Sequence, residues 1–338
     1  MSKNSKANSH FDSLVRIMLG FKKTIFFLFG LSLFLIPGQG YYKTLQVDQR
    51  SPVVRMAPLK ISQPSAYPIN ISGRLQPNIT AKSFLILDRD SAVVMAEKNS
   101  SQQLLPASTV KIMTALVALD HYQPNDVLTG NNLRHQGQVM EIGQGERLTF
   151  LSLLYGLLVS SANDAAEVLA QNYPGGKSNF VAMMNQKARK LNLFGTYYSN
   201  PSGLNDDWEG NLLAGLSITT SLDLARLSLE ALKNPLFAKV VSTQKTTVFD
   251  ITGQSAHQLY NINQLLGRVE GVKGIKTGWT EDAQECLVTY VERNGRRVVL
   301  VVLGSQDRFG ETNILIDWVF ENFQWEELDL LATAAKHR

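Results

Sequence analysis

Strand-like segments lie near both ends of this chain, and helical segments occupy its middle. Near the start, the segment 83–96 reads as two short strands joined by a turn. Near the end, 286–291 and 297–303 are rich in Val and Leu and are joined through Asn294-Gly295, a strong signal for a β-hairpin. This order predicts one mixed α+β domain, an antiparallel sheet with flanking helices and a helical cluster.

The helices expected from apolar spacing fall between and after these strands. Residues 112–119 are apolar around most of a helix, which predicts a buried helix that begins near Ser108. The others are expected at 149–171 with a break at 160–163, at 179–191 with Phe180, Met183, Met184 and Ala188 on one face, at 222–231, and at 312–320, packed on the sheet.

The first forty residues have a different character. One acid, Asp12, stands there against five bases, which are Lys3, Lys6, Arg16, Lys22 and Lys23. The apolar run 25–36 follows, too short to cross a bilayer comfortably, and Pro37-Gly38 ends it. We therefore expect 1–40 to be a signal peptide or an N-terminal membrane anchor and the rest to be exported, periplasmic or extracytoplasmic. Because residues 38–40 match the usual small-residue cleavage site only loosely, the sequence predicts either a cleaved signal peptide or an uncleaved anchor.

Charge and cysteine content exclude several classes of protein. The whole chain has 33 Lys plus Arg against 29 Asp plus Glu. Without the first forty residues, 33 − 5 = 28 bases face 29 − 1 = 28 acids, so the excess belongs to the leader and no nucleic-acid partner is expected. The single cysteine, Cys286, excludes an intramolecular disulfide and a thiolate-rich metal site, and we expect it in the core.

Composition also suggests where the folded part begins and ends. Residues 41–80 are rich in Pro, Ser, Gln and Asn without a sustained period, which predicts a spacer. We expect the folded, catalytic domain at 81–322 and a short tail at 323–338.

The first motif with chemical meaning is Pro106-Ala-Ser-Thr-Val-Lys111. Positions i and i+3 of a helix share a face, so Ser108 and Lys111 would point into the same space. A lysine desolvated at a buried helix start can serve as the base that activates a serine. Alone, the pair is weak, because such spacing is common and Ser108 could be a plain helix N-cap.

The second motif is Ser160-Ser-Ala-Asn-Asp164, at the break between two apolar helical runs. Ser161 could relay protons and Asn163 could bind a substrate amide. The alternative is a capped helix restart, with Asn163 or Asp164 as N-cap.

The third motif is Lys276-Thr277-Gly278, directly before the C-terminal hairpin. An edge strand with Lys, Thr and Gly can bind an extended peptide and hold its carboxylate. Such residues are also common on any exposed strand.

Together, the three motifs change the interpretation. A Ser-x-x-Lys, a Ser-x-Asn about 50 residues later and a Lys-Thr-Gly about 115 beyond that follow the order of the motifs in serine β-lactamases and penicillin-binding proteins. Residues 79–320 resemble the serine-type D-alanyl-D-alanine carboxypeptidases, the low-molecular-mass penicillin-binding proteins. The likeness includes PASTVKIMTALVALD, SLLYGLLVSSANDAAEVLA, NPSGL and NINQLLGRVEGVKGIKTGWTEDAQECLV.

The resemblance implies a β-lactamase/transpeptidase-like fold and a role for each motif residue. Ser108 would be the acylated nucleophile, Lys111 its base, and Ser161 and Asn163 the second wall of the cleft. Lys276 and Thr277 would engage the substrate's terminal carboxylate or its neighbourhood, and Gly278 would let the substrate approach the strand closely. Arg308 is the best-placed match to a family arginine that helps to hold that carboxylate. Backbone N–H groups of Ser108 and of a residue near Trp279 would form the oxyanion hole.

Two positions depart from the family pattern. Ala283-Gln284 stands where relatives commonly have Ala-Gly, so the turn there could differ, and Ser-Ala-Asn replaces the common Ser-Gly-Asn.

The implied activity is removal of the terminal D-alanine from peptidoglycan stem peptides through an acyl-enzyme, without metal or cofactor, and with β-lactams as covalent inhibitors. A D,D-endopeptidase that cuts crosslinks and a catalytically weak penicillin-binding sensor remain alternatives. A β-lactamase fits less well, since the segment after the second motif offers no clear carboxylate for deacylation.

Overall fold

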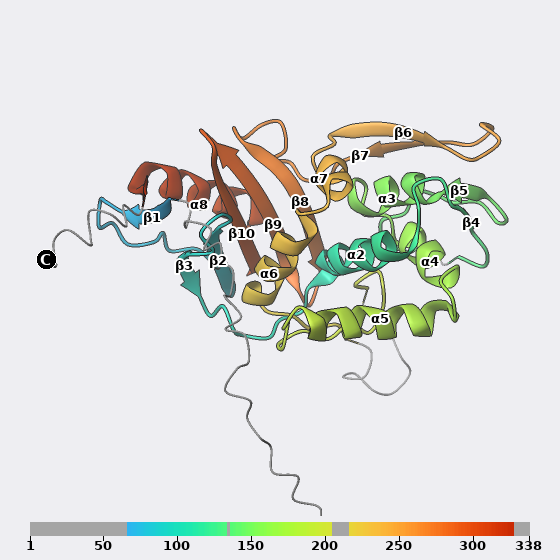
Figure 1. Cartoon of the computed structure of the whole chain (residues 1–338), viewed down its shortest axis with the longest axis horizontal. Coiled ribbons are helices and arrows are strands. Elements are labelled where there is room, and N and C mark those ends of the chain that lie inside the picture. Colours follow the sequence, from blue (N-terminus) through green and yellow to red (C-terminus); the bar gives the residue numbers. More distant parts are fainter. Residues whose placement is uncertain (1–65, 134–135, 205–215, 328–338) are drawn as a thin grey trace, which may run out of the picture. The chain divides into compact units, whose positions relative to one another are not determined.

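A five-stranded antiparallel sheet lies at the centre of the fold (Figure 1). The computed structural model describes residues 66–133, 136–204 and 216–327. The sheet has the strand order β3-β2-β10-β9-β8. Its strands are β2 (Ser83–Asp88), β3 (Val94–Lys98), β8 (Val272–Thr280), β9 (Gln284–Arg293) and β10 (Arg296–Ser305). Both expected hairpins are confirmed, and Asn294 and Gly295 have the positive φ angles of 51° and 73° that a tight hairpin turn favours.

Alternation along the strands divides the core into two layers. On β10, Val298, Leu300 and Val302 pack with the helix α8 (Arg308–Asn322). The intervening residues Val299, Val301 and Leu303 pack with the other helices. In Figure 1 the sheet accordingly stands between α8 and the helices α2 to α5. The expected α+β class and the packing of the last helix on the sheet are thus confirmed.

The helical cluster follows the expected order. Its members are η1 (Ala107–Val110), α2 (Lys111–His121), α3 (Phe150–Leu158), α4 (Asn163–Gln171), α5 (Gly176–Lys190), α6 (Ser221–Ala231) and α7 (Pro235–Val241). Residues 111–118 of α2 are all buried, as the apolar run predicted. The expected break between α3 and α4 is present. On α5, Phe180, Met184 and Ala188 are buried, and Met183 is half-buried against the same cluster.

Three two-stranded sheets complete the fold. They are β4 (Val127–Thr129) with β5 (Arg147–Thr149), β6 (Lys245–Phe249) with β7 (Ala256–Tyr260), and β1 (Tyr67–Asn70) with β11 (Phe323–Glu326).

The pair β1 and β11 moves the limits of the domain outward. These strands come from the expected spacer and the expected tail, and they align Tyr67 with Glu326 and Asn70 with Phe323. The indole Nε1 of Trp325 donates a hydrogen bond of 2.7 Å to Asp88 Oδ1 on the central sheet. The folded region therefore extends beyond the expected limits of 81 and 322 at both ends.

The remaining expectations concern the leader and the cysteine. The segment 1–40 and most of the spacer lie outside the described residues. Within the residues that are described, no helix is long and apolar enough to cross a membrane. Cys286, on β9, is fully buried as expected, and this burial raises the pKa of its thiol to about 11.

Candidate active site

The first motif brings a serine and a lysine together at the start of the buried helix α2. Ser108 lies in the 3-10 turn η1, and Lys111 is the first residue of α2. Lys111 Nζ lies 2.9 Å from Ser108 Oγ. Nζ also donates hydrogen bonds to two oxygens that can only accept, Asn163 Oδ1 at 2.7 Å and the backbone carbonyl of Ser202 at 2.6 Å. The third neighbour of the amine is therefore the serine hydroxyl.

This environment suits a neutral lysine. A neutral amine has two N–H bonds and one lone pair, so two donated bonds leave the lone pair for the hydroxyl of Ser108. Lys111 is fully buried, and burial lowers its pKa to about 7 against the raising effect of the carboxylates of Asp164 and Glu167. A substantial fraction of Lys111 is thus unprotonated near neutral pH and able to accept a proton.

The backbone around Ser108 is closely packed. Ala107 has a positive φ of 45°, and two glycines approach it from other parts of the chain. A Cβ built on Gly278 would lie 3.1 Å from Ser108 N, and one built on Gly203 would overlap the carbonyl oxygen of Ala107. The strand β8 and the NPSGL segment therefore hold the serine in place through backbone contact.

The second motif lines the cleft instead of capping a helix. Ala162 is the N-cap of α4 and makes no side-chain capping bond. The N-cap alternative for Asn163 and Asp164 is therefore wrong. Asn163 points to Lys111, and its Nδ2 donates a 2.7 Å bond to Gln136 O. Ser161, at a positive φ of 63°, accepts a hydrogen bond of 2.7 Å from Lys276 Nζ.

The third motif lies on β8, which is the last strand of the central sheet next to β9 and therefore an edge strand. Lys276 is only 2% exposed. Burial, together with the positive charges of Lys111 and Arg308, holds its pKa well below the ordinary value. Its Nζ donates to Ser161 Oγ and to Thr277 O, which ties the third motif to the second.

Thr277 and Arg308 each have a buried polar atom that makes no hydrogen bond to the described residues. Thr277 Oγ1 and Arg308 Nε are buried, and neither has a hydrogen-bond partner within the described part of the chain. Arg308 Nη1 donates to Gly278 O at 2.9 Å, and burial lowers the pKa of the guanidinium. Buried donors without acceptors are costly, so these groups are suited to an anionic ligand.

A cleft of about 330 Å³ connects the three motifs. It is lined by Ser108, Gln138, Ser161, Ile262, Thr277, Gly278, Trp279, Glu285 and Arg308. Gln138, Ile262 and Glu285 were not expected from the sequence. Glu285 accepts a 2.8 Å hydrogen bond from Arg308 N, and its place directly after the unusual Gln284 could have drawn attention to it.

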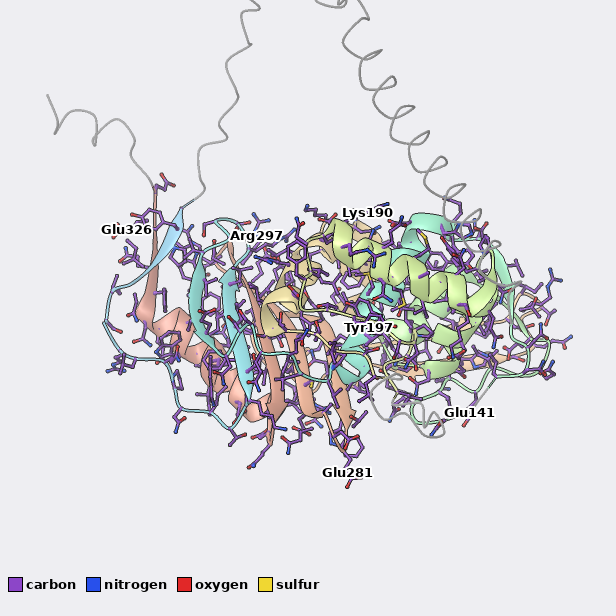
Figure 2. All side chains as sticks on the ribbon, turned by 90° about the horizontal axis from the view of Figure 1, so that it is seen from below. Glu141, Lys190, Tyr197, Glu281, Arg297 and Glu326 are labelled. Carbon is purple, nitrogen blue, oxygen red and sulfur yellow. The ribbon has the colours of Figure 1, made fainter. Side chains whose placement is uncertain are left out.

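The β8–β9 turn is formed in spite of its unusual residue. Figure 2 shows Glu281 of this turn at the end of the sheet. Gln284 adopts a positive φ of 58°, the conformation that a glycine would take without steric cost. The departure from the family pattern therefore adds backbone strain to the turn. It does not prevent the strands from pairing, because Thr280 still lies opposite Gln284.

Comparison with known sequences identifies the family. Residues 71–307 match the family described as D-alanyl-D-alanine carboxypeptidase. The chain is 33% identical over 252 residues to the D-alanyl-D-alanine carboxypeptidase DacB2 of Mycobacterium tuberculosis, covering 72% of this chain and 84% of that protein. It is 30% identical over 258 residues to DacF of Bacillus subtilis, covering 73% of this chain and 64% of DacF. A D-alanyl-D-alanine endopeptidase of Pseudomonas aeruginosa is 31% identical over 253 residues, 72% of this chain and 79% of that protein.

Solved structures give the same result. The D-alanyl-D-alanine carboxypeptidase of Mycobacterium tuberculosis superimposes with a TM-score of 0.68 at 30% identity, covering 77% of this chain and all (100%) of that one. Penicillin-binding protein D2 of Listeria monocytogenes, in its ampicillin-bound form, gives a TM-score of 0.64 at 28% identity, covering 72% and 100%. The fold is that of the penicillin-binding serine peptidases. The chain belongs to the D-alanyl-D-alanine carboxypeptidase family.

Proposed function

We propose that this protein removes the terminal D-alanine from peptidoglycan stem peptides through an acyl-enzyme on Ser108. The observation that carries the proposal is the set of three contacts around Lys111 Nζ, because two carbonyl oxygens accept hydrogen bonds from the amine and its third neighbour is the hydroxyl of Ser108. The family and the ampicillin-bound relative support a peptidoglycan substrate and β-lactam binding.

The first chemical step is attack by Ser108 Oγ on the carbonyl carbon of the penultimate D-alanine. The hydroxyl proton moves to Lys111, and the developing negative charge lies on the substrate oxygen. Backbone N–H groups of Ser108 and Trp279 would stabilise that oxygen. The C–N bond then breaks, a proton passes to the departing amine, and free D-alanine leaves.

The second step is hydrolysis. Water attacks the ester carbon, its proton goes to a base in the cleft, and the bond to Ser108 Oγ breaks with return of a proton to the serine. Ser161 and Lys276, joined at 2.7 Å, offer a route for protons between the two walls of the cleft.

Recognition of the substrate depends on its terminal carboxylate. The unpartnered atoms of Thr277 and Arg308 can each donate to it. Asn163, which the sequence suggested for binding a peptide amide, has its side-chain oxygen on Lys111 and its side-chain nitrogen on Gln136 O, so its contribution here is to orient Lys111. An extended peptide can lie along the edge strand β8, where Gly278 permits close approach.

The proposal also includes the place of action. A substrate in the cell wall requires export, and the basic and apolar N-terminal segment is suited to it. If that segment stays uncleaved, it would provide the membrane contact.

The test is mass spectrometry of the protein after exposure to penicillin, together with an assay of D-alanine release from a D-Ala-D-Ala peptide. We expect one adduct on Ser108 and release of D-alanine, with both lost in Ser108→Ala. A wild-type protein that forms no adduct, or an adduct that persists in the variant, would contradict the proposal.

A D,D-endopeptidase is the second candidate, favoured by the similarity to the endopeptidase of Pseudomonas aeruginosa. Incubation with a monomeric pentapeptide and with a crosslinked dimer separates the two activities. We expect faster cleavage of the monomer. Preference for the dimer would assign the endopeptidase activity.

A further inference from the structure

The backbone of residues 136–146, here called the cleft segment, orients Asn163. Asn163 N donates to Gln138 O at 2.7 Å, and Asn163 Nδ2 donates to Gln136 O at 2.7 Å. The side chain of Gln138 lines the catalytic cleft. The position of Asn163 Oδ1, one of the two carbonyl oxygens on Lys111, thus depends on where the cleft segment lies.

The cleft segment is held at Met140 from two sides. Met140 N donates to the carboxylate of Asp164, at 3.1 Å and 3.2 Å to its two oxygens. Met140 O lies 2.7 Å from Nδ1 of His257, which belongs to the hairpin of β6 and β7. The other ring nitrogen, Nε2, lies 2.6 Å from Glu146 Oε1 at the far end of the segment. His257 therefore bridges two points of the cleft segment.

The hydrogen-bond partners of His257 favour a ring that donates from both nitrogens. A backbone carbonyl oxygen can only accept a hydrogen bond, so Nδ1 donates to Met140 O, and Nε2 donates as well when Glu146 is an ionised carboxylate. Only the imidazolium form has two N–H groups. The side chains of His257 and Glu146 are 8% and 10% exposed, which makes this a nearly buried ion pair.

The charged surroundings agree with that form. His257 shares a cavity with Glu141 and Glu146, and no other charged residue lines it within the described chain. Glu141, labelled in Figure 2, is exposed on the cleft segment. Asp164, on the other side of Met140, is also a carboxylate. No cation among these groups competes with the imidazolium.

We propose that His257, as an imidazolium bound to Met140 O and Glu146, is a positioning residue that fixes the cleft segment and through it Asn163 beside Lys111. When the ring loses one proton, it can keep only one of its two donated hydrogen bonds. The segment then loses one attachment, and Asn163 Oδ1 is held less firmly on the Lys111 amine.

The first experiment is nitrogen-15 NMR of the wild-type protein with labelled histidine. The chain has five histidines, and the spectrum of His257→Gln assigns the resonance. At neutral pH we expect protons on both ring nitrogens of His257. A neutral ring with a single protonated nitrogen would overturn the inference. This measurement is independent of the proposed activity, so a protein that releases no D-alanine could still pass it.

The second experiment is a double-mutant cycle on acylation by a fluorescent penicillin, and it rests on the proposed function. We expect His257→Gln to slow acylation about tenfold in the wild-type background and less than about twofold when Asn163 is already Ala, because the two residues act in series. Equal slowing in both backgrounds would overturn the inference, since a general loss of stability would act equally in both.

Thr247→Ala is the matched control for the cycle. Thr247 lies on the same hairpin, paired with Gln258 and exposed to solvent. We expect acylation by this variant to stay at the wild-type rate. Slowing by Thr247→Ala to the extent seen with His257→Gln would assign the effect to the hairpin as a whole and overturn the role of the imidazolium.

Discussion

The α-carbon of Gly203 packs against the carbonyl of Ala107, the residue directly before the nucleophile. Gly203 has a positive φ of 81°, and its Cα leaves no room for a side chain, because a Cβ would overlap Ala107 O and lie 3.2 Å from Ser108 N. The NPSGL segment thus shapes the backbone that presents Ser108, and the adjacent Ser202 O accepts a bond from Lys111.

Gly203→Ala is therefore expected to slow acylation of Ser108 and to destabilise the fold. Gly253→Ala is the matched control, since Gly253 has a similar φ of 74° and nothing within 4 Å of an added Cβ. The backbone strain alone costs about 1–2 kcal/mol, so both variants should lose that stability, and Gly203→Ala should lose more. Thermal unfolding and penicillin acylation rates measure both effects. Equal acylation by the two variants would contradict the role given to Gly203.

The lowered pKa of Lys111 predicts how acylation depends on pH. With a pKa of about 7, Lys111 loses its lone pair to a proton as the pH falls below that value. The rate of penicillin acylation should therefore fall about tenfold per pH unit on the acidic side and level off above neutrality. Rates measured between about pH 5 and pH 8 would show this limb. A rate that does not change across that range would rule out Lys111 as the base.

Replacement of the same lysine gives a complementary result. Lys111→Ala removes the general base and should slow acylation by about 10²–10⁴-fold. Because Lys111 is fully buried and holds Ser202 and Asn163, circular dichroism has to accompany the kinetics. Full acylation activity in a folded Lys111→Ala protein would assign the proton transfer to another group.

The unpartnered atoms of Thr277 and Arg308 predict specificity for a free carboxylate. Loss of a hydrogen bond to a charged group costs about 1.5–3 kcal/mol, so Thr277→Val and Arg308→Ala should each lower kcat/KM for a D-Ala-D-Ala peptide by about 10–100-fold. A peptide amide that lacks the terminal carboxylate is the control substrate. On it, the variants should differ little from the wild type. Equal losses of kcat/KM on both substrates would show that these residues do not act by binding the terminal carboxylate.

The turn between β8 and β9 predicts a stabilising substitution. Gln284 has a φ of 58°, so Gln284→Gly removes a steric cost and should raise the free energy of unfolding by about 0.5–1 kcal/mol. Asn294→Gly is the comparison, because asparagine at a φ of 51° tolerates this conformation better and should gain less. A chemical denaturation series would compare them, and a loss of stability in Gln284→Gly would refute the account of this turn.

Regular apolar patterns made much of the fold predictable. The strands β9 and β10 alternate between two buried faces, and Asn294-Gly295 fits only a tight turn, so that hairpin could be placed from local sequence. The strand β1, with the sequence YPIN, has neither the length nor the alternation to be recognised, and its partner β11 lies about 250 residues away. Its pairing is a property of tertiary structure.

The candidate active site is also only partly predictable from the sequence. The spacing of Ser108 and Lys111 and the order of the three motifs predict which side chains meet. Apart from Ser202 in the NPSGL segment, the residues that position them belong to no motif. Ser202 contributes a backbone carbonyl, Gln136 and Gln138 contribute backbone oxygens to Asn163, and His257 contributes from a distant hairpin. Backbone groups are the same in every residue, so sequence carries no mark of their role.

The pairing of β1 with β11 has a mechanical consequence. Tyr67 lies opposite Glu326, so chain that enters at the first strand and chain that leaves at the last are attached at one place. A truncation that removes either strand would leave the other without its hydrogen-bonding partner, so the two ends of the folded region depend on each other for their order.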